Sequence, residues 1–301
     1  MNYLITGGTG LIGQALIKQL LRQKAVITVL TRNINNAKKL LPASIHLIDT
    51  LSIADIDNCD VVINLAGETI ADKRWSTKQK NTICQSRWQL TSAIAELIKQ
   101  AKNPPNLFLS GSAIGFYGRQ NNQVVIDENF TQAHQEFTHE VCQQWEQLAL
   151  QAASKNTRVA VLRTGIVLAP VKSGGALAKM FLPFKLGVGG KVSSGEQIMS
   201  WIHIEDMVNA ILFIAQNENL DGAINLTAPM PVSNGVFSKA LATQLKRPCF
   251  FTTPAWVFKL LFGEMSDLLL YGQQVVPAKL LNAGFVFNHK TVNEALSNLI
   301  T

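Results

Sequence analysis

The first 32 residues constrain the fold most, because a short apolar run, a glycine-rich turn, a helical pattern and a second apolar run follow one another. Residues 3–6 (YLIT) suit a buried parallel strand, and apolar positions between Leu11 and Leu20 recur at helical spacing. Residues 25–30 (AVITVL) are rich in the β-branched side chains that strands favour. This order predicts a βαβ unit with a right-handed crossover.

Three glycines in G-x-x-G-x-x-G spacing, Gly7, Gly10 and Gly13, lie between the first strand and the helix. In a dinucleotide-binding turn the first permits the tight turn, the second lets the backbone approach a pyrophosphate, and the third lets the helix pack closely on the sheet. The free N–H groups and positive end of the helix would face the phosphates. The alternative is a tight turn that binds no ligand. The cofactor contacts predicted in this turn are Gly7, Thr9, Gly10, Leu11, Ile12 and Gly13.

The end of the second predicted strand indicates which dinucleotide would bind. An Asp or Glu there hydrogen-bonds the ribose 2′-hydroxyl and selects NAD, but the residues here are Thr31, Arg32 and Asn33. Arg32 lies 19 residues after Gly13, at the distance where a guanidinium would bind a 2′-phosphate and stack on adenine. We therefore predict NADP as the cofactor, with Thr31 and Arg32 as contacts. The alternative is a solvated arginine at the start of a loop.

The composition is that of an ordinary globular protein. The chain has 301 residues, 47% hydrophobic and 16% charged, which allows a large core in one domain or two lobes. Its formal charge of +7 favours anionic ligands or simply aids solubility. Because the sequence has no dense Lys/Arg runs and none of the known nucleic-acid-binding motifs, we predict no nucleic-acid partner.

The cysteines and the apolar segments argue against other classes of protein. The four cysteines are far apart and form no C-x-x-C pair, so we expect neither a disulfide framework nor a metal site. The most apolar stretch, residues 254–272, carries three charged side chains, which a membrane span would tolerate poorly. The first strand begins at Asn2, which leaves no place for a signal peptide. We therefore expect a cytoplasmic protein without a membrane partner.

Strand and helix patterns alternate through residues 1–165, which predicts an α/β fold with a Rossmann-type, doubly wound parallel sheet that binds NADP. Residues 166–301 mix loops with helices and are expected to form mainly a smaller C-terminal substrate lobe. Residues 222–229 (GAINLTAP) are the exception, because we expect them to return a strand to the main sheet.

Five segments carry a resemblance to known proteins. They are TGGTGLIG (residues 6–13), DVVINLAGE (60–68), LFLSGSAIGFYG (107–118), VAVLRTGIVLAP (159–170) and SWIHIEDMVNAI (200–211). In these segments the chain resembles the extended short-chain dehydrogenase/reductase superfamily, which includes nucleotide-sugar epimerases and dehydratases. Further stretches, among them QSRWQLT and EVCQQWE, resemble one epimerase-like subfamily. Its human member is described as an NADP-dependent oxidoreductase, and its bacterial members are named epimerase-family proteins.

The resemblance implies further site residues. The turn after the fourth strand would lie along the cofactor, and the loop after the sixth strand would lie over the nicotinamide. Ser112, at the end of the fifth strand, aligns with the catalytic serine; the alternative is a serine that caps a strand end. Tyr117 matches a common structural or substrate-wall position and could supply the acid only if its loop folds back. The cofactor contacts implied in this way are Leu65, Ala66, Gly67, Glu68, Arg74 and Thr164.

The chain departs from the superfamily at its catalytic pair. Active members carry a tyrosine followed four residues later by a lysine, which lowers the tyrosine pKa and holds the ribose. None of the three tyrosines here has a lysine four residues on. FTHEVCQQWE (residues 137–146), predicted to begin a helix, places Thr138 and Cys142 at the two positions. Cys142 is either a redox or nucleophilic thiol near the nicotinamide or a small buried apolar residue.

Other polar residues give weaker signals. The glycine-rich residues 184–197 predict a mobile loop or hairpin over the cleft, where Lys185 and Lys191 could meet an anionic substrate. Arg87 is interpreted as part of a helix salt bridge. The residues interpreted as structural support for the substrate lobe are Trp201, His203 and Asp206.

Two functions are compatible with these patterns. The first is an NADP-dependent oxidoreductase or epimerase-like enzyme with a nonstandard proton donor, whose candidate catalytic residues are Ser112, Cys142 and Tyr117. Its substrate would be a small molecule, with an anionic one favoured by the charge. The second is a non-catalytic NADP-binding sensor or partner-binding protein, a class to which relatives named as cell-division factors would belong. The sequence predicts neither the substrate nor the oligomeric state.

Overall fold

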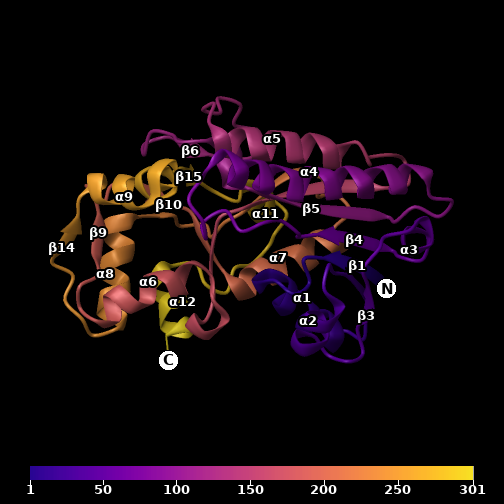
Figure 1. Cartoon of the computed structure of the whole chain (residues 1–301), viewed down its shortest axis with the longest axis horizontal. Helices are drawn as coiled ribbons and strands as arrows, with labels where there is room; N and C mark the ends of the chain where they lie inside the picture. The colour runs from indigo at the N-terminus through magenta and orange to yellow at the C-terminus, as the bar shows by residue number, and fades with distance from the viewer. Residues whose placement is uncertain (301) are drawn as a thin grey trace.

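The computed structural model describes residues 1–300, and its centre is one parallel sheet. The strands of this sheet are β1 (Asn2–Thr6), β2 (Val26–Leu30), β3 (His46–Ile48), β4 (Val61–Asn64), β5 (Leu107–Ala113), β7 (Arg158–Thr164) and β12 (Gly222–Leu226). They lie side by side in the order β12-β7-β5-β4-β1-β2-β3, and every neighbouring pair is parallel (Figure 1). Because the strand order changes direction between β1 and β4, a crevice for a ligand is expected at the carboxyl ends of these two strands.

Helices cover both faces of the sheet. One face carries α1 (Leu11–Arg22), α2 (Ile34–Leu40) and α7 (Ile204–Gln216). The other face carries α3 (Ile53–Asp57), α4 (Thr77–Gln100) and α5 (Phe137–Leu150), with α4 and α5 lying along the top of the view (Figure 1). The predicted Rossmann-type, doubly wound fold is confirmed.

The apolar runs of the sequence become strands that are buried on both sides. In β1, Ile5 packs with Leu16 of α1, whereas its neighbour Leu4 packs with Ile94 of α4. A strand covered on both faces needs apolar side chains at every position, which explains the unbroken run YLIT. Helix α1 buries Leu16, Ile17 and Leu20 at the three-to-four-residue spacing that the sequence shows.

A second group of elements lies at the end of the molecule away from α2 and β3 (Figure 1). Its core includes Trp201, Phe237 and Leu296, which are buried together. The elements after β7, apart from α7 and β12, are β8 (Ile166–Leu168), η2 (Val171–Ser173), α6 (Gly175–Lys185), β9 (Gly190–Val192), β10 (Ile198–Met199), β11 (Trp201–His203), β13 (Val232–Ser233), α8 (Asn234–Gln244), β14 (Phe251–Thr253), α9 (Ala255–Phe262), η3 (Gly263–Ser266), α10 (Asp267–Leu270), β15 (Gln274–Val275), α11 (Ala278–Asn282) and α12 (Val292–Leu299). Two short elements follow β5, namely η1 (Ile114–Tyr117) and β6 (Val125–Ile126).

Residues 184–197, predicted to be a mobile loop or a hairpin, form neither a continuous loop nor a hairpin. They contain the end of α6 and strand β9, which pairs in parallel with β14, so that Gly190 lies opposite Phe251. This pairing joins segments about sixty residues apart, which local sequence patterns do not reveal. Helix α7 was expected to belong to the substrate lobe with most of residues 166–301. Instead, its buried side chains pack on the main sheet. No helix within residues 1–300 combines the length and hydropathy that crossing a membrane requires.

Candidate functional site

The glycine turn between β1 and α1 has the geometry of an anion site. Gly7 has φ +72°, which favours glycine, and a Cβ on Gly13 would lie 2.3 Å from the Gly7 carbonyl oxygen. Gly10 caps α1 without a side-chain hydrogen bond, and the first turn of the helix contains no acidic residue. Within residues 1–300, the backbone N–H groups of Leu11 and Ile12 have no hydrogen-bond acceptor. These donors, at the positive end of the helix, fit a pyrophosphate.

The rest of the turn is held by backbone contacts. Thr9 contributes its carbonyl oxygen, which accepts a hydrogen bond of 2.7 Å from the side chain of Gln14. Gly10 N donates to the Gly7 carbonyl oxygen at 3.0 Å. The turn is therefore rigid before any ligand binds, which reduces the entropy that a ligand must overcome.

The turn after β4 lies directly against the glycine turn. A Cβ on Gly7 would lie 2.6 Å from the carbonyl carbon of Leu65, and Ala66 N donates to the Thr6 hydroxyl at 3.3 Å. Gly67 follows and is exposed. The two glycine-containing turns therefore meet at the carboxyl edge of β1 and β4, where the strand order changes direction.

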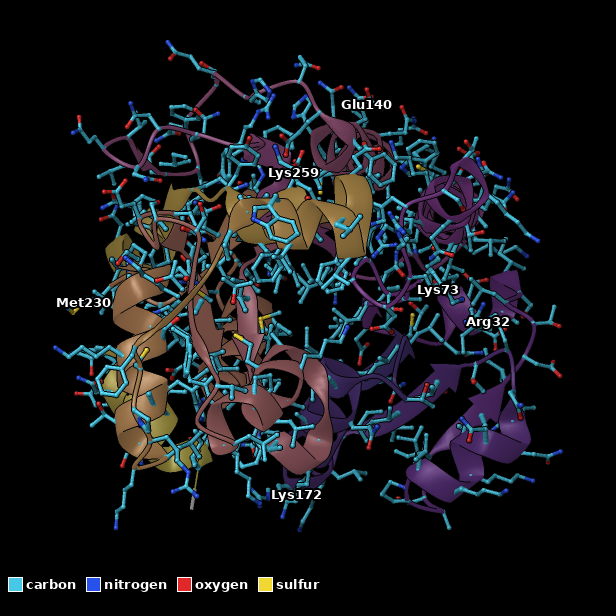
Figure 2. All side chains as sticks on the ribbon, turned by 60° about the vertical axis from the view of Figure 1, so that its left-hand side comes forward. Arg32, Lys73, Glu140, Lys172, Met230 and Lys259 are labelled. Carbon is cyan, nitrogen blue, oxygen red and sulfur yellow. The ribbon has the colours of Figure 1, made fainter. Side chains whose placement is uncertain are left out.

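Arg32 lies just beyond the end of β2, with only Thr31 between them. Thr31 N donates to the Ile48 carbonyl oxygen at 2.9 Å, which fixes the backbone there, and Asn33 caps α2. The Arg32 side chain is exposed and forms no ion pair with any described residue. Figure 2 shows it projecting on the same side of the molecule as Lys73. A free guanidinium at this strand end is suited to a phosphate.

Glu68 forms an ion pair close to it in the sequence, whereas Arg74 lies against the C-terminal part of the chain. Glu68 forms an ion pair of 3.1 Å with Lys73, and the hydrogen bond from Lys73 is the main reason why the pKa of Glu68 is lowered. Arg74 lies against the C-terminal lobe, because its Nη2 would be 3.2 Å from a Cβ on Gly263 of η3. Thr164 ends β7, and its hydroxyl donates to the Leu162 carbonyl oxygen at 3.1 Å.

Helix α5 begins at Phe137, as predicted, and carries Thr138 and Cys142 on one buried face. The Thr138 hydroxyl donates to Glu136 at 2.7 Å. Cys142 is 4% exposed, and burial, followed by the nearby charge of Glu146, raises its pKa to about 12. A nucleophilic thiol needs a lowered pKa. These surroundings contradict the interpretation of Cys142 as a nucleophile and favour that of a small buried residue.

Ser112 belongs to a buried charged network. Its hydroxyl donates to Glu146 Oε1 at 2.6 Å, and the serine is 5% exposed. Arg163 of β7 donates to both oxygens of Glu146, at 2.9 and 2.8 Å. Burial alone would lower the pKa of Arg163, but the bond to Glu146 and its charge raise it overall. The carboxylate therefore fixes the direction of the Ser112 hydrogen.

Tyr117 is the third candidate catalytic residue, and it is completely buried. Its hydroxyl donates to Asn225 at 2.8 Å and accepts from Arg163 at 2.9 Å. Burial is the main cause of its raised pKa. The loop does not fold back to bring this hydroxyl into the open, so a role for Tyr117 as proton donor is not supported by its position. Tyr117 instead connects β7 with β12.

Sequence reasoning missed the polar networks below the site. Glu146, Arg163 and Asn225 were not singled out, although an arginine inside an apolar strand requires a buried partner. A second network runs from Thr6 to Asn64 at 2.6 Å, then to Thr91 at 2.8 Å. The partners lie on different elements, so no local spacing identifies them.

Arg87 does not form the expected helix salt bridge. Its Nη1 donates to the Ile83 carbonyl oxygen one turn earlier in α4, at 3.0 Å. No carboxylate of the described chain forms an ion pair with it. The guanidinium lies instead over Gly67 and the ring of Trp145.

The residues interpreted as structural lie at the start of α7 and just before it, where Asp206 contacts the C-terminal segment. Asp206 accepts hydrogen bonds from the backbone N–H groups of Asn288 and His289, at 2.8 and 2.9 Å. His203, Glu205 and His289 lie close enough to suggest a metal ion. However, His203 Nδ1 accepts from Glu205 N at 3.1 Å, which leaves the proton on Nε2, where it blocks ligation.

The two lysines of residues 184–197 also lie apart from the candidate catalytic residues. Lys191 lines a surface hollow with Lys239, Gly195 and Ser233. Lys185 ends α6, with its ammonium over the ring of Phe181 at 5.6 Å. Neither lysine contacts the glycine turn or Ser112.

Comparison with known proteins agrees with this arrangement. The model of the NAD dependent epimerase/dehydratase family matches residues 3–226, and a domain of unknown function (DUF1731) matches residues 253–299. An epimerase family protein of Staphylococcus aureus (strain MRSA252) is 37% identical over 312 residues, covering 100% of this chain and 99% of the relative.

Two solved structures are similar over the whole chain. Human epimerase family protein SDR39U1, solved with NADPH, has a TM-score of 0.87 and 29% identity, covering 100% of this chain and 99% of that one. The nucleoside-diphosphate sugar epimerase of Corynebacterium glutamicum has a TM-score of 0.80 and 28% identity, covering 100% and 58%. With its glycine turn, parallel sheet and matched residues 3–226, the chain belongs to the NAD-dependent epimerase/dehydratase family and is an NAD(P)-binding protein of that family.

Proposed function

We propose that this protein binds NADP(H) and is an oxidoreductase of the epimerase type that acts on a small substrate. The observation that carries the proposal is the glycine turn with its free N–H groups, next to an exposed and unpaired Arg32 at the end of the β2 segment. The turn suits the pyrophosphate, and Arg32 suits a 2′-phosphate. The similar human protein was solved with NADPH, which supports the same choice here.

The cofactor would supply or accept hydride, and Ser112 would orient the substrate. Because the Ser112 hydrogen is directed to Glu146, its oxygen acts as an acceptor: the Cys142 thiol forms a hydrogen bond with Ser112, and a second lone pair can accept from a substrate hydroxyl. Arg163 holds Glu146 in place through two hydrogen bonds. This arrangement fixes the direction of approach without the Tyr-x-x-x-Lys pair. The net charge of +7 favours an anionic substrate.

Dinucleotide binding is tested by titrating the purified protein with NADPH and with NADH and following the fluorescence of the nicotinamide. We expect NADPH to bind more tightly, by at least about tenfold, because a charge-assisted hydrogen bond contributes about 1.5–3 kcal/mol. Tighter binding of NADH would reject the NADP assignment.

Catalysis is tested by screening small hydroxyl and carbonyl compounds for a change in NADPH absorbance. Once a substrate is found, Ser112→Ala should lower kcat by about 100-fold, as loss of one orienting group does in other active sites. Ser110→Ala is the matched control, because Ser110 lies on the same strand and its hydroxyl reaches only the Gly111 carbonyl oxygen, at 3.4 Å. Equal turnover by the two variants would remove Ser112 from the mechanism.

A further inference from the structure

The net charge of the chain comes from two segments that follow β7, residues 165–195 and 222–263. Neither segment contains an Asp or a Glu, and together they carry eight lysines and arginines. Of the 27 basic and 20 acidic residues in the chain, 19 basic and all 20 acidic ones lie elsewhere. The positive charge is therefore local, and a local excess of one sign favours a partner of the opposite sign.

Most of these cations have no counter-charge. Lys179 forms an ion pair with Asp72, but within residues 1–300 the other seven form none. Glu196, just after the first segment, lines the same surface hollow as Lys191 and Lys239 without pairing with either. Unpaired cations on one part of a protein repel one another, and an anionic partner would relieve that repulsion.

Three of the unpaired cations gather around a second surface hollow. Lys191, Lys239 and Arg247 line it together with Phe250 and Phe251, and no acidic side chain does so. The two segments meet here because β9 pairs with β14, and because Arg247 Nε donates to the Lys185 carbonyl oxygen at 2.8 Å. The hollow therefore combines positive charge with aromatic side chains.

Bulky apolar side chains are exposed around the same hollow. Phe250 is 86% exposed, and Leu186 and Val188 are 67% and 58% exposed. Gly187, between these two aliphatic residues, lies against Arg247, since its Cβ would be 4.0 Å from the Arg247 Cδ. Aliphatic and aromatic side chains thus surround the cations in water, where they stabilise nothing.

Helix α9 continues the exposed apolar surface beyond β14. Seven of its eight residues are apolar, yet none is buried. β9, β14, α8 and α9 lie together at the end of the molecule away from α2 and β3, with β14 outermost (Figure 1). A flat or extended partner can therefore reach this end without meeting the main sheet.

The partner must accept both kinds of side chain. An anionic lipid surface does so, because its phosphates attract lysine and arginine while the boundary between headgroups and acyl chains accepts aromatic and aliphatic side chains. A nucleic acid would take the cations but offers no apolar phase to Leu186 and Val188. A second copy of this chain would bring like charges together.

We propose that the β14 face, formed by Lys191, Lys239, Arg247, Phe250 and Phe251, docks peripherally on an anionic lipid membrane. The cations contact the headgroup phosphates, and the phenylalanines insert among the headgroups. The expectation of no membrane partner rested on spanning segments, which a peripheral contact does not need. The β14 face shares no residue with the glycine turn or the Ser112 network, so the proposal is independent of NADP(H) binding.

The charge is tested by sedimenting the full chain with vesicles of phosphatidylglycerol and phosphatidylcholine in equal parts, and with vesicles of phosphatidylcholine alone. We expect binding to the anionic vesicles only. Lys191→Gln/Lys239→Gln should weaken it by about 25-fold, because each basic side chain near an anionic surface contributes about a factor of five. Neither lysine forms an ion pair, so the variant should melt as the wild type does.

The matched control is Lys38→Gln/Lys39→Gln, which removes the same charge from α2 at the other end of the molecule and should bind within about twofold of the wild type. Binding to phosphatidylcholine alone as tight as to the anionic vesicles overturns the proposal. So does equal weakening by the two double variants, which would show that only the net charge matters, or no binding to either vesicle.

Insertion is tested at Phe250, whose exposure allows substitution without loss of packing. Phe250→Ser should weaken vesicle binding by about tenfold, the effect of one aromatic side chain that no longer leaves water. Phe250→Trp should bind as the wild type does, and its added fluorescence should shift to shorter wavelength with anionic vesicles. An unshifted emission, with Phe250→Ser binding as the wild type does, overturns docking through this face.

Two further measurements address the other partners. Sedimentation velocity without lipid should give the same species for the wild type and Phe250→Ser; a dimer that this substitution dissociates would make a second copy the occupant. Duplex DNA should not compete with the vesicles for the wild type. Tighter binding to DNA than to anionic vesicles would assign the face to a nucleic acid instead.

Discussion

Cys142 shows how burial determines the chemistry of a single residue. Its position on the sequence allowed a reactive thiol, but in the fold burial and Glu146 raise its pKa to about 12. Cys59 is in a similar state, with its pKa also raised to about 12, mainly by burial. Cys249 is the more accessible thiol.

We therefore predict that a thiol reagent such as DTNB modifies Cys249 first in the native protein at pH 8. Only the thiolate reacts, and a raised pKa together with burial keeps Cys142 protonated and inaccessible. Cys249→Ser should remove the fast phase of the reaction, and Cys142→Ser should leave it unchanged. Loss of the fast phase in Cys142→Ser would show that Cys142 is the reactive thiol.

At the residue scale, the glycine turn has the backbone geometry that its spacing indicates. Gly7, Gly13 and Arg32 are identified by spacing along one βαβ unit, because a turn and the two elements beside it are determined by nearby residues. The bonds of Glu146 with Ser112 and Arg163 depend on how α5 packs on β5 and β7. That packing cannot be obtained from spacing, so the network was missed and Ser112 was assigned without its main partner.

At the scale of elements, the start of α7 depends on one buried histidine. His203 is the N-cap of α7, and its Nδ1 accepts a hydrogen bond from Glu205 N. Burial, then the neighbouring His289, lowers the pKa of His203 from 6.5 to about 4. Protonation would remove the accepting lone pair, so the folded protein keeps His203 neutral.

We predict that the free energy of unfolding decreases as the pH falls from 6.5 to about 4, because the unfolded chain binds a proton at His203 that the folded chain does not. The full effect of such a pKa difference is about 3 kcal/mol at pH 4. His203→Asn keeps an N-cap acceptor but does not titrate. Urea unfolding at several pH values should therefore give a flatter profile for this variant; identical profiles would show that His203 does not contribute.

Element types were predicted where the pattern is local. The βαβ unit and the start of α5 at Phe137 follow from periodicity and are found as expected. The pairing of β9 with β14 was not predicted, because three-residue strands have little periodicity and their partner lies far along the chain. Loop signals such as glycine-rich residues 184–197 therefore do not exclude a short strand.

At the scale of the whole molecule, the C-terminal segment is part of the main core. The family model of unknown function begins at residue 253, but Leu280, Phe285 and Phe287 pack with the side chains of the main sheet. Thr227, which follows β12, donates to the Val275 carbonyl oxygen at 3.2 Å. The segment thus contributes to both parts of the fold.

We predict that a chain ending at residue 252 does not fold cooperatively. It loses Leu280, Phe285 and Phe287, each of which stabilises the core by about 2 kcal/mol through burial. That loss is comparable with the total stability of a domain, about 5–15 kcal/mol. A chain ending at residue 289 is the matched control: it keeps these three side chains and removes α12, which belongs to the second core.

The control should retain NADPH binding with a lower Tm, whereas the shorter chain should show no cooperative melting by circular dichroism. A shorter chain that melts cooperatively and binds NADPH would show that residues 1–252 are an independent unit. The glycine turn was predicted within residues 1–165. No pattern in the sequence indicated that residues 280–287 pack into the core of the main sheet.

The most direct test of NADP(H) binding is the ratio of the dissociation constants for NADH and NADPH, measured by fluorescence for the wild type and for Arg32→Ala. If Arg32 binds the 2′-phosphate, the wild type prefers NADPH by at least about tenfold, and the substitution lowers the ratio to about one by weakening NADPH alone. A wild type that prefers NADH, or a ratio that Arg32→Ala leaves unchanged, would contradict the assignment.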